Sequence, residues 1–212
     1  MTSGRTPLLI MGAGGLGREL YGWIAGAGTD LQPIGFCDDT PGVELGRFGI
    51  DLPVGPPEEI IPRFPGAKFL IAIGAGTARE KLASRLINLG IEPATFVHPS
   101  VIMGPNVEIG EGSIVCPATV ITTEVRIGRF VLVNCSCNIG HDVTIGDYST
   151  LLGNNAVNGS VTLGSHVNMG SGSLIHPKLR VGDGATIGIG SVVIRNVATG
   201  TSVFGVPAVR LG

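Results

Sequence analysis

The stretch Ile127–Asp147, IGRFVLVNCSCNIGHDVTIGD, decides the fold, because an aliphatic side chain returns at every sixth residue within it. A helix repeats about every 3.6 residues and a strand about every 2, so neither produces this spacing. On both sides of this stretch an aliphatic residue continues to occur at every sixth position, giving fifteen consecutive positions in all: Ile109, Val115, Ile121, Ile127, Val133, Ile139, Ile145, Leu151, Val157, Leu163, Met169, Ile175, Val181, Ile187 and Val193.

Every third repeat carries an aliphatic–glycine pair, as at Ile127-Gly128 and Ile145-Gly146, so the structural unit is 18 residues long. Such a unit predicts a parallel β-helix with three short strands per coil, in which the aliphatic side chains point inward. Neighbouring coils should stack about 4.8 Å apart. A solenoid needs caps at its ends. We expect the preceding domain to cover one end and Gly205–Ala208 to end the regular repeat at the other.

Residues 1–95 follow a different pattern, in which strand and helix signals alternate. The predicted strands are Leu8–Met11, Pro33–Cys37 and Lys68–Ile73. The predicted helices are Arg18–Ala25, Pro56–Pro62 and Ala78–Leu89, the last ended by Gly90. Strands separated by helices imply a parallel sheet with crossover connections. The chain therefore divides into a small Rossmann-like α/β domain over 1–95 and a β-helix over 96–212.

The composition narrows the class of protein. The chain has 212 residues, of which 43% are hydrophobic and 14% charged, with a formal net charge of −2. A net charge this close to zero does not indicate a nucleic-acid-binding surface. No apolar run approaches the roughly 20 residues of a membrane span, and the first residues lack the layout of a signal peptide. We expect a cytoplasmic protein that binds neither nucleic acid nor membrane.

The cysteines and histidines do not predict a metal site. Cys37, Cys116, Cys135 and Cys137 show neither disulfide nor zinc spacing, so we expect reduced, structural thiols. A zinc-dependent β-helix of the carbonic anhydrase type would need three converging histidines. His141, His166 and His176 contain no close pair at ligand spacing. We expect structural or subunit-contact roles for His166 and His176, and a hydrogen-bonded junction role for His98.

Six short motifs follow one another along the chain: Gly12–Glu19, Phe36–Asp39, Ile71–Gly74, Val97–Ser100, Ile139–Asp142 and Val203–Ala208. With the sharp change to a period of six, they make the sequence resemble the NeuD/PglD-like family of sugar acyltransferases, most of all its GDP-perosamine N-acetyltransferases. The resemblance covers nearly the whole chain. It implies a left-handed β-helix that binds acetyl-CoA, a front domain that binds a nucleotide sugar, a homotrimer with sites between subunits, and a place in O-antigen biosynthesis.

His141 and Asp142 interrupt this structural repeat with groups that can move a proton. His141 is the second residue after the inward Ile139, which places it at an exposed coil corner. There it could be a surface residue without function, but an adjacent carboxylate can fix its tautomer and raise its basicity. In the family this position is the general base. Gly159 lies one coil further on, and the family has an oxyanion-binding backbone N–H at the matching position; alternatively, it is a simple corner glycine.

The resemblance also implies residues that contact the cofactor. By position match these are Gly170, Ser171, Gly188, Ile189 and, near the adenine end, Pro207. Some relatives carry a second histidine nine positions after the catalytic one, and this sequence has Thr150 there. A threonine hydroxyl could still bond a carbonyl of acetyl-CoA. Packing within the coils is the alternative role for each of these residues.

Gly12, Gly14 and Gly17 form a G-x-G-x-x-G loop between a predicted strand and helix, with Asp38 further on. That arrangement is typical of dinucleotide binding, but about 95 residues make only half of a full dinucleotide fold. Half a fold suits one nucleotide, with its phosphate at the helix N-terminus. The alternative is tight strand-to-helix packing. The residues that the resemblance assigns to the nucleotide sugar are Gly14, Gly15, Leu16, Asp38, Asp39 and Gly74.

These features favour an acetyl-CoA-dependent transferase that needs no metal and acetylates the 4-amino group of a nucleotide-linked 4-amino-4,6-dideoxy sugar. O-acetylation of sialic acid or a similar sugar is the main alternative, although an amine is the better nucleophile. An NAD-dependent enzyme is disfavoured by the half-length fold. A nucleotidyltransferase is disfavoured because no basic triphosphate loop is present. A scaffold without catalytic activity remains the last alternative.

Overall fold

The computed structural model describes residues 4–211, which form two compact units. The first unit contains the residues up to Gly74 together with Lys81–Ala94. The second contains Ala75–Glu80 and the chain from Thr95 onward. The sequence pattern gave no sign that the six residues Ala75–Glu80 group with the β-helix.

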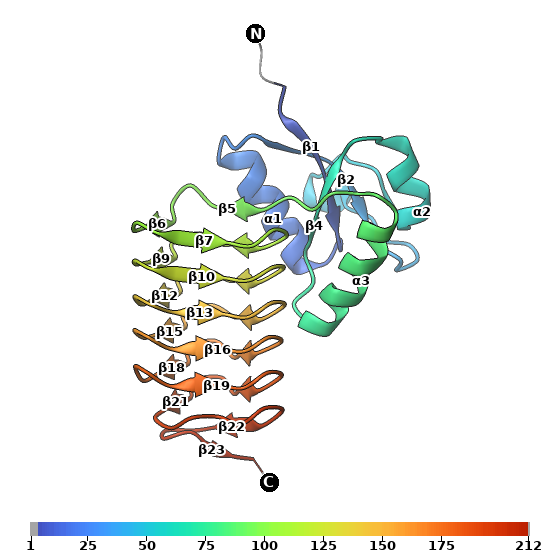
Figure 1. Ribbon diagram of the computed structural model, residues 1–212. Coiled ribbons are helices and arrows are strands. Elements are labelled where there is room, and N and C mark those ends of the chain that lie inside the picture. Colours follow the sequence, from blue (N-terminus) through green and yellow to red (C-terminus); the bar gives the residue numbers. More distant parts are fainter. Residues whose placement is uncertain (1–3, 212) are drawn as a thin grey trace. The chain divides into compact units, whose positions relative to one another are not determined.

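The first unit is built on a parallel sheet of four strands in the order β3-β2-β1-β4 (Figure 1). The strands are β1 (Thr6–Met11), β2 (Leu31–Cys37), β3 (Val54–Gly55) and β4 (Lys68–Ile71). The three longer strands confirm the predicted ones, and their apolar runs are buried as expected in a parallel sheet. The sequence does not predict β3, because two residues carry no periodic signal.

Helical segments lie between these strands, and α3 follows the last of them. They are α1 (Gly15–Gly26), η1 (Gly46–Phe48), α2 (Pro57–Ile60), η2 (Ile61–Arg63) and α3 (Gly76–Asn88). α1 begins before its predicted start at Arg18, because the second half of the glycine loop forms the first helical turn. A side chain at Gly17 would collide with the carbonyl oxygen of Gly12. Gly17 is therefore a packing glycine, which lets α1 lie close to the end of β1.

The second unit is a parallel β-helix with three sheets along its length (Figure 1). The first sheet contains β6 (Ile102–Met103), β9 (Val120–Ile121), β12 (Asn138–Ile139), β15 (Ala156–Val157), β18 (Leu174–Ile175) and β21 (Val192–Val193). The second contains β7 (Val107–Ile109), β10 (Val125–Ile127), β13 (Thr144–Ile145), β16 (Thr162–Leu163) and β19 (Arg180–Val181). The third contains β5 (Phe96–Val97), β8 (Ile114–Val115), β11 (Leu132–Val133), β14 (Thr150–Leu151), β17 (Asn168–Met169), β20 (Thr186–Ile187), β22 (Ser202–Phe204) and β23 (Val209–Arg210).

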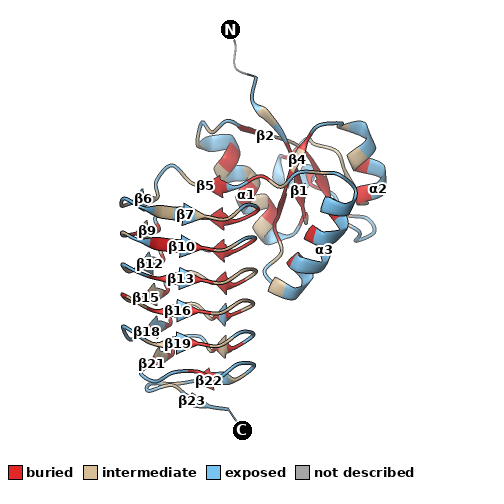
Figure 2. Cartoon of the chain, viewed as in Figure 1, coloured by how far each residue is buried: buried red, intermediate tan, exposed pale blue. Residues whose placement is uncertain are grey.

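The strand register confirms the 18-residue unit. Ile127 pairs with Ile145 in the second sheet, and Ile139 pairs with Val157 in the first. Of the fifteen positions in phase, all are buried except Ile109, which is half-buried near the start of the repeat (Figure 2). Burying one Ile or Leu side chain stabilises a fold by about 1.5–3 kcal/mol. This aliphatic column is therefore the main source of stability of the second unit.

The corners of the coils share one backbone conformation. The third residue after each inward aliphatic from Ile109 to Ile187 has a positive φ, as at Asp142 (φ 60). Asn, Asp and Gly reach this left-handed region with the least strain. Phe130, Tyr148 and His166 also adopt it, and they occupy one corner of successive coils. Their rings stack with centroids 5.5 Å and 5.2 Å apart.

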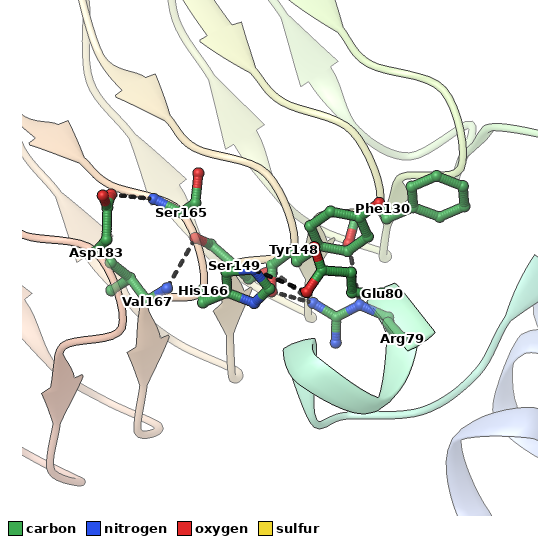
Figure 3. A network of polar contacts seen from close by, with 9 residues as sticks. All are labelled: Arg79, Glu80, Phe130, Tyr148, Ser149, Ser165, His166, Val167 and Asp183. Carbon is green, nitrogen blue, oxygen red and sulfur yellow. Dashed lines mark hydrogen bonds and ion pairs between the residues drawn. The ribbon is translucent and has the colours of Figure 1, made fainter. Parts of the chain in front are cut away.

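Arg79, in the first turn of α3, lies against this aromatic corner within the second unit (Figure 3). Arg79 is almost fully buried, with 2% of its surface exposed. Its guanidinium donates hydrogen bonds to the backbone oxygens of Phe130 at 3.0 Å, Tyr148 at 2.8 Å and Ser149 at 2.9 Å. Burial lowers the pKa of Arg79 to about 10, so the side chain stays charged at neutral pH. One buried cation thus ties two consecutive coils to the start of α3.

His166 and His98 have the structural roles that the sequence predicts. His166 stacks on Tyr148, and its Nε2 lies 3.4 Å from a carboxylate oxygen of Glu80 (Figure 3). His98 Nδ1 lies 2.8 Å from the hydroxyl of Ser100 and accepts the Ser100 N–H at 3.1 Å. Neither ring lies at a corner next to His141.

The regular repeat ends before Gly205–Ala208. After Val193, Thr186 in β20 pairs with Ser202 in β22, so the last coil is two residues shorter than the others. β23 then pairs antiparallel with β22. The last parallel strand, β22, ends at Phe204, so the coils stop where Gly205–Ala208 begins, as the sequence predicts.

Candidate active site

His141 stands at the corner between β12 and β13, where its side chain is 63% exposed. The inward Ile139 before it and Ile145 after it are both buried, so the coil on either side is fixed by the core. The imidazole itself contributes nothing to that core. An exposed imidazole on a coil that the buried core holds rigid is well placed to contact a ligand.

His141 and Asp142 form a pair. The distance from His141 Nδ1 to Asp142 Oδ2 is 2.7 Å. A carboxylate accepts only, so Nδ1 carries the proton in this pair and Nε2 is free to accept one. Asp142 holds the imidazole in the tautomer that a general base needs.

Gly159 lies directly beside the basic nitrogen. A Cβ built on Gly159 would be 2.5 Å from His141 Nε2, so the ring can take this position only because residue 159 has no side chain. The same corner one coil further on holds Pro177.

The N–H of Gly159 has no hydrogen-bond partner within residues 4–211, although Gly159 itself is buried. At the matching place of the neighbouring corner, the N–H groups of Arg129 and Ser165 each donate to an aspartate one coil further on, Asp147 or Asp183, at 2.8 Å. Pro177 offers no such acceptor to Gly159, and no hydrogen bond from the Gly159 N–H is found within residues 4–211. The site therefore combines a proton acceptor with a backbone donor, the two groups that acyl transfer requires.

Substitution of Gly159 by alanine is expected to lower kcat/KM by about 10- to 100-fold, because the new methyl group displaces the His141 ring from its position. Gly159 does not have a positive φ, so alanine fits its backbone and thermal stability should change little. Gly22→Ala, in α1, is the control for an added methyl group, because a Cβ there would meet nothing within 4 Å. Equal activity of the two variants would contradict the assigned geometry.

The residues predicted to bind the cofactor lie at another corner of the coils. Gly170 and Ser171 follow β17, and Gly188 and Ile189 follow β20, so all four extend from the third sheet. His141 follows a strand of the first sheet. One copy of the second unit therefore does not bring these four residues and His141 to the same corner. Ile189 is 65% exposed and unobstructed for contact.

Two further predicted cofactor residues differ in exposure. Thr150 is only 3% exposed, so its hydroxyl is not on the open surface of this chain. Pro207 is exposed near the last coil.

In the first unit, Asp38 ties down the glycine loop. Its Oδ2 accepts the N–H of Ala13 at 2.8 Å and its Oδ1 accepts the N–H of Thr40 at 2.9 Å. Burial alone would raise the pKa of Asp38, but these hydrogen bonds lower it, so the carboxylate stays charged. Asp39 is the more accessible of the two acids, with its Oδ2 3.9 Å from Nη1 of Arg85.

Two hollows open on either side of this loop, of about 440 Å³ and about 390 Å³. Gly14 and Asp38 line both, and Asp39 lines the smaller one. Of the predicted ligand residues, Gly15, Leu16 and Gly74 line neither. The larger hollow is also lined by residues that sequence reasoning missed: Arg18, Thr40, Pro41, Gly42, Val43, Glu44, Arg47 and Phe48. No motif marks these residues, because most lie in an irregular loop.

Within residues 4–211, no group of three His, Cys, Asp or Glu side chains is arranged to hold a metal ion. In that part of the chain, no helix is both long enough and apolar enough to cross a bilayer.

Comparisons with known proteins place the chain in a class. A family model described as the PglD N-terminal domain matches residues 7–86. WeeI from Acinetobacter baumannii AYE is 31% identical, with a TM-score of 0.88 over 97% of this chain and 100% of that one. Perosamine N-acetyltransferase from Caulobacter crescentus, solved as a variant with CoA and GDP-perosamine, is 26% identical, with a TM-score of 0.87 over 97% of each chain.

A curated relative matches over a shorter stretch. UDP-N-acetylbacillosamine N-acetyltransferase from Bacillus subtilis (strain 168) is 34% identical over 110 residues. The matched stretch is 50% of this chain and 49% of that protein.

The fold and the similarity to these acetyltransferases define a left-handed β-helix acyltransferase with a small α/β front domain. Within that class, the chain belongs to the NeuD/PglD-like family of sugar acyltransferases.

Proposed function

We propose that the protein transfers the acetyl group of acetyl-CoA to the 4-amino group of a nucleotide-linked 4-amino-4,6-dideoxy sugar of the perosamine type. The observation that carries the proposal is the His141–Asp142 pair, whose Nε2 lies beside Gly159, a residue whose N–H has no hydrogen-bond partner within the described residues. The similarity to proteins named as N-acetyltransferases of bacillosamine and perosamine nucleotides supports an amine as the acceptor.

The reaction needs one base and one oxyanion donor. The neutral amine of the sugar attacks the thioester carbonyl carbon, and a C–N bond forms while His141 Nε2 takes the amine proton. The carbonyl oxygen becomes an oxyanion and accepts the Gly159 N–H. Collapse of the tetrahedral centre breaks the C–S bond, and the imidazolium returns its proton to the departing thiolate of CoA. Asp142 stabilises the imidazolium while it exists.

Direct transfer is favoured over an acyl-cysteine intermediate. Burial, with the nearby charge of Asp39, raises the pKa of Cys37 to about 12. Burial also raises the pKa of Cys137 to about 11. A thiol that stays protonated at neutral pH is a poor nucleophile. The amine of the sugar needs no such intermediate.

The ligands divide between the two units. The first unit would bind the nucleotide sugar through the loop at Gly14 and through Asp39, whose carboxylate is open to a ribose hydroxyl. The CoA arm would lie on the corner formed by Gly170 and Ile189. Because that corner is not the corner of His141, a complete site needs residues from two copies of the second unit, as in the homotrimer that the resemblance implies.

The first experiment measures release of free thiol from acetyl-CoA with GDP-, UDP- and dTDP-linked 4-amino-4,6-dideoxy sugars, starting with GDP-perosamine. GDP-rhamnose, which carries a 4-hydroxyl and is also 6-deoxy, is the matched acceptor without the amine. We expect release with one amino sugar and none with GDP-rhamnose. Release only with sialic acid would instead establish O-acetylation, and no release with any acceptor would contradict a transferase.

A further inference from the structure

Arg18 and Arg47 surround one aromatic ring in the larger hollow of the first unit. The guanidinium carbon of Arg18 lies 4.0 Å from the centre of the Phe48 ring, and that of Arg47 lies 4.7 Å from it. Arg18 is in the first turn of α1, and Arg47 and Phe48 are in η1. Two segments of the first unit that are distant in sequence thus bring two cations to one ring.

Neither cation is neutralised by a carboxylate within residues 4–211. The ion pairs found there involve neither Arg18 nor Arg47. The Arg18 side chain has one long hydrogen bond, 3.4 Å, to the carbonyl oxygen of Ala13. Two like charges this close repel each other, so the pair is unfavourable unless an anion lies between them or water screens them.

The surroundings add positive potential on the same side. The first turn of α1 contains no acidic residue, and Gly14 at its N-cap offers no side chain to the helix amides. The N-terminus of a helix carries a partial positive charge and free N–H donors. Both oxygens of Asp38 are already occupied by the N–H groups of Ala13 and Thr40. Glu44 also lines the hollow, and it is exposed.

We infer that Arg18 and Arg47 form a clamp for the diphosphate of the nucleotide sugar, with Phe48 holding the two guanidinium groups in place. A guanidinium binds phosphate oxygens in a bidentate fork, and it stacks on an aromatic face without losing those donors. Two forks and a helix N-terminus match a group with two adjacent phosphates better than a group with one. The inference rests on the proposed function and specifies which part of the substrate the larger hollow holds.

The test measures binding by calorimetry to the full chain, without catalysis. GDP, UDP and dTDP, and the corresponding monophosphates, are titrated into the wild type, Arg18→Met and Arg47→Met. Methionine retains an unbranched stem over the ring and removes the charge. We expect each substitution to weaken binding of the preferred diphosphate by about 10- to 100-fold, since hydrogen bonds to charged groups are stronger than those between neutral groups. The monophosphate should be affected less, so the preference for two phosphates shrinks.

Arg63→Met is the matched control. Arg63 also lies over a phenylalanine, with its guanidinium 5.7 Å from the centre of the Phe64 ring, but it does not line the larger hollow. Its affinity for the diphosphate should equal that of the wild type. Thermal unfolding of every variant shows that the fold is kept.

Three outcomes overturn the inference in different ways. If Arg18→Met and Arg47→Met bind the diphosphate as well as Arg63→Met does, the clamp is wrong while the proposed function stands. If the wild type binds none of the nucleotides, this result contradicts a nucleotide sugar as the substrate in the proposed function. It then contradicts the clamp as well. Loss of di- and monophosphate binding by the same factor would assign the arginines to a single phosphate or the base, and would also reject the clamp.

Discussion

Replacing His141 with alanine is expected to lower kcat by about 100- to 10,000-fold, the usual contribution of a general base. The side chain is 63% exposed, and its one hydrogen bond within the described residues is to Asp142. Removing it therefore costs the fold little. Steady-state thiol release gives kcat, and thermal unfolding shows whether the protein stays folded. Binding of CoA and of the nucleotide sugar should be nearly unchanged, because the imidazole acts mainly when the proton moves.

Two variants serve as controls for this result. His176→Ala removes another exposed histidine of the β-helix, whose contact is with the backbone oxygen of Pro177, and it should retain nearly full activity. Asp142→Asn keeps the shape of the side chain and tolerates the left-handed backbone at φ 60, but it removes the charge that steadies the imidazolium. It should lose activity with the fold intact. Wild-type turnover by His141→Ala would reject the base.

The repeat made most of the second unit predictable. Each in-phase aliphatic residue from Val115 to Val193 is an independent indication of a buried position, so these fourteen agreeing positions leave little freedom in the register. The corner at His141 follows from that register by counting. Its contact with Gly159 follows too, because residues 18 apart lie side by side in adjacent coils.

Other features depend on contacts that no short pattern encodes. The cluster of Arg18, Arg47 and Phe48 joins two segments whose separation is set by an irregular loop. Asp38 illustrates the same limit: its place after a strand suggests a ligand contact, but its oxygens are bound to backbone N–H groups that only the folded loop supplies. A periodic pattern predicts the scaffold because it reports burial, and it says little about exposed polar side chains.

Arg79 is the clearest feature that the sequence did not reveal, and Arg79→Met is expected to destabilise the protein by about 3 kcal/mol. Methionine fills much of the same space, but it removes the Arg79 donor from the buried carbonyl oxygens of Phe130, Tyr148 and Ser149. The Ser149 oxygen still accepts the N–H of Leu132 at 3.0 Å, so the loss is less than three full hydrogen bonds. Each unsatisfied buried group costs about 1–3 kcal/mol, and partial access of water reduces the total. The midpoint of urea unfolding, followed by circular dichroism, measures the loss.

Arg85→Met separates this effect from a general effect of charge removal. Arg85 lies in the same helix, α3, but its side chain is 42% exposed and pairs with Asp39 and Glu58 at the surface. Exposed pairs of this kind contribute about 0–1 kcal/mol. Arg79→Lys tests the geometry, because a single ammonium keeps the charge but lacks the planar fork that reaches three carbonyls on two coils. Its stability should fall between those of the wild type and Arg79→Met. If Arg79→Met unfolds at the same urea concentration as Arg85→Met, the buried cation does not hold the coils together, and the aliphatic column alone accounts for the stability of this corner.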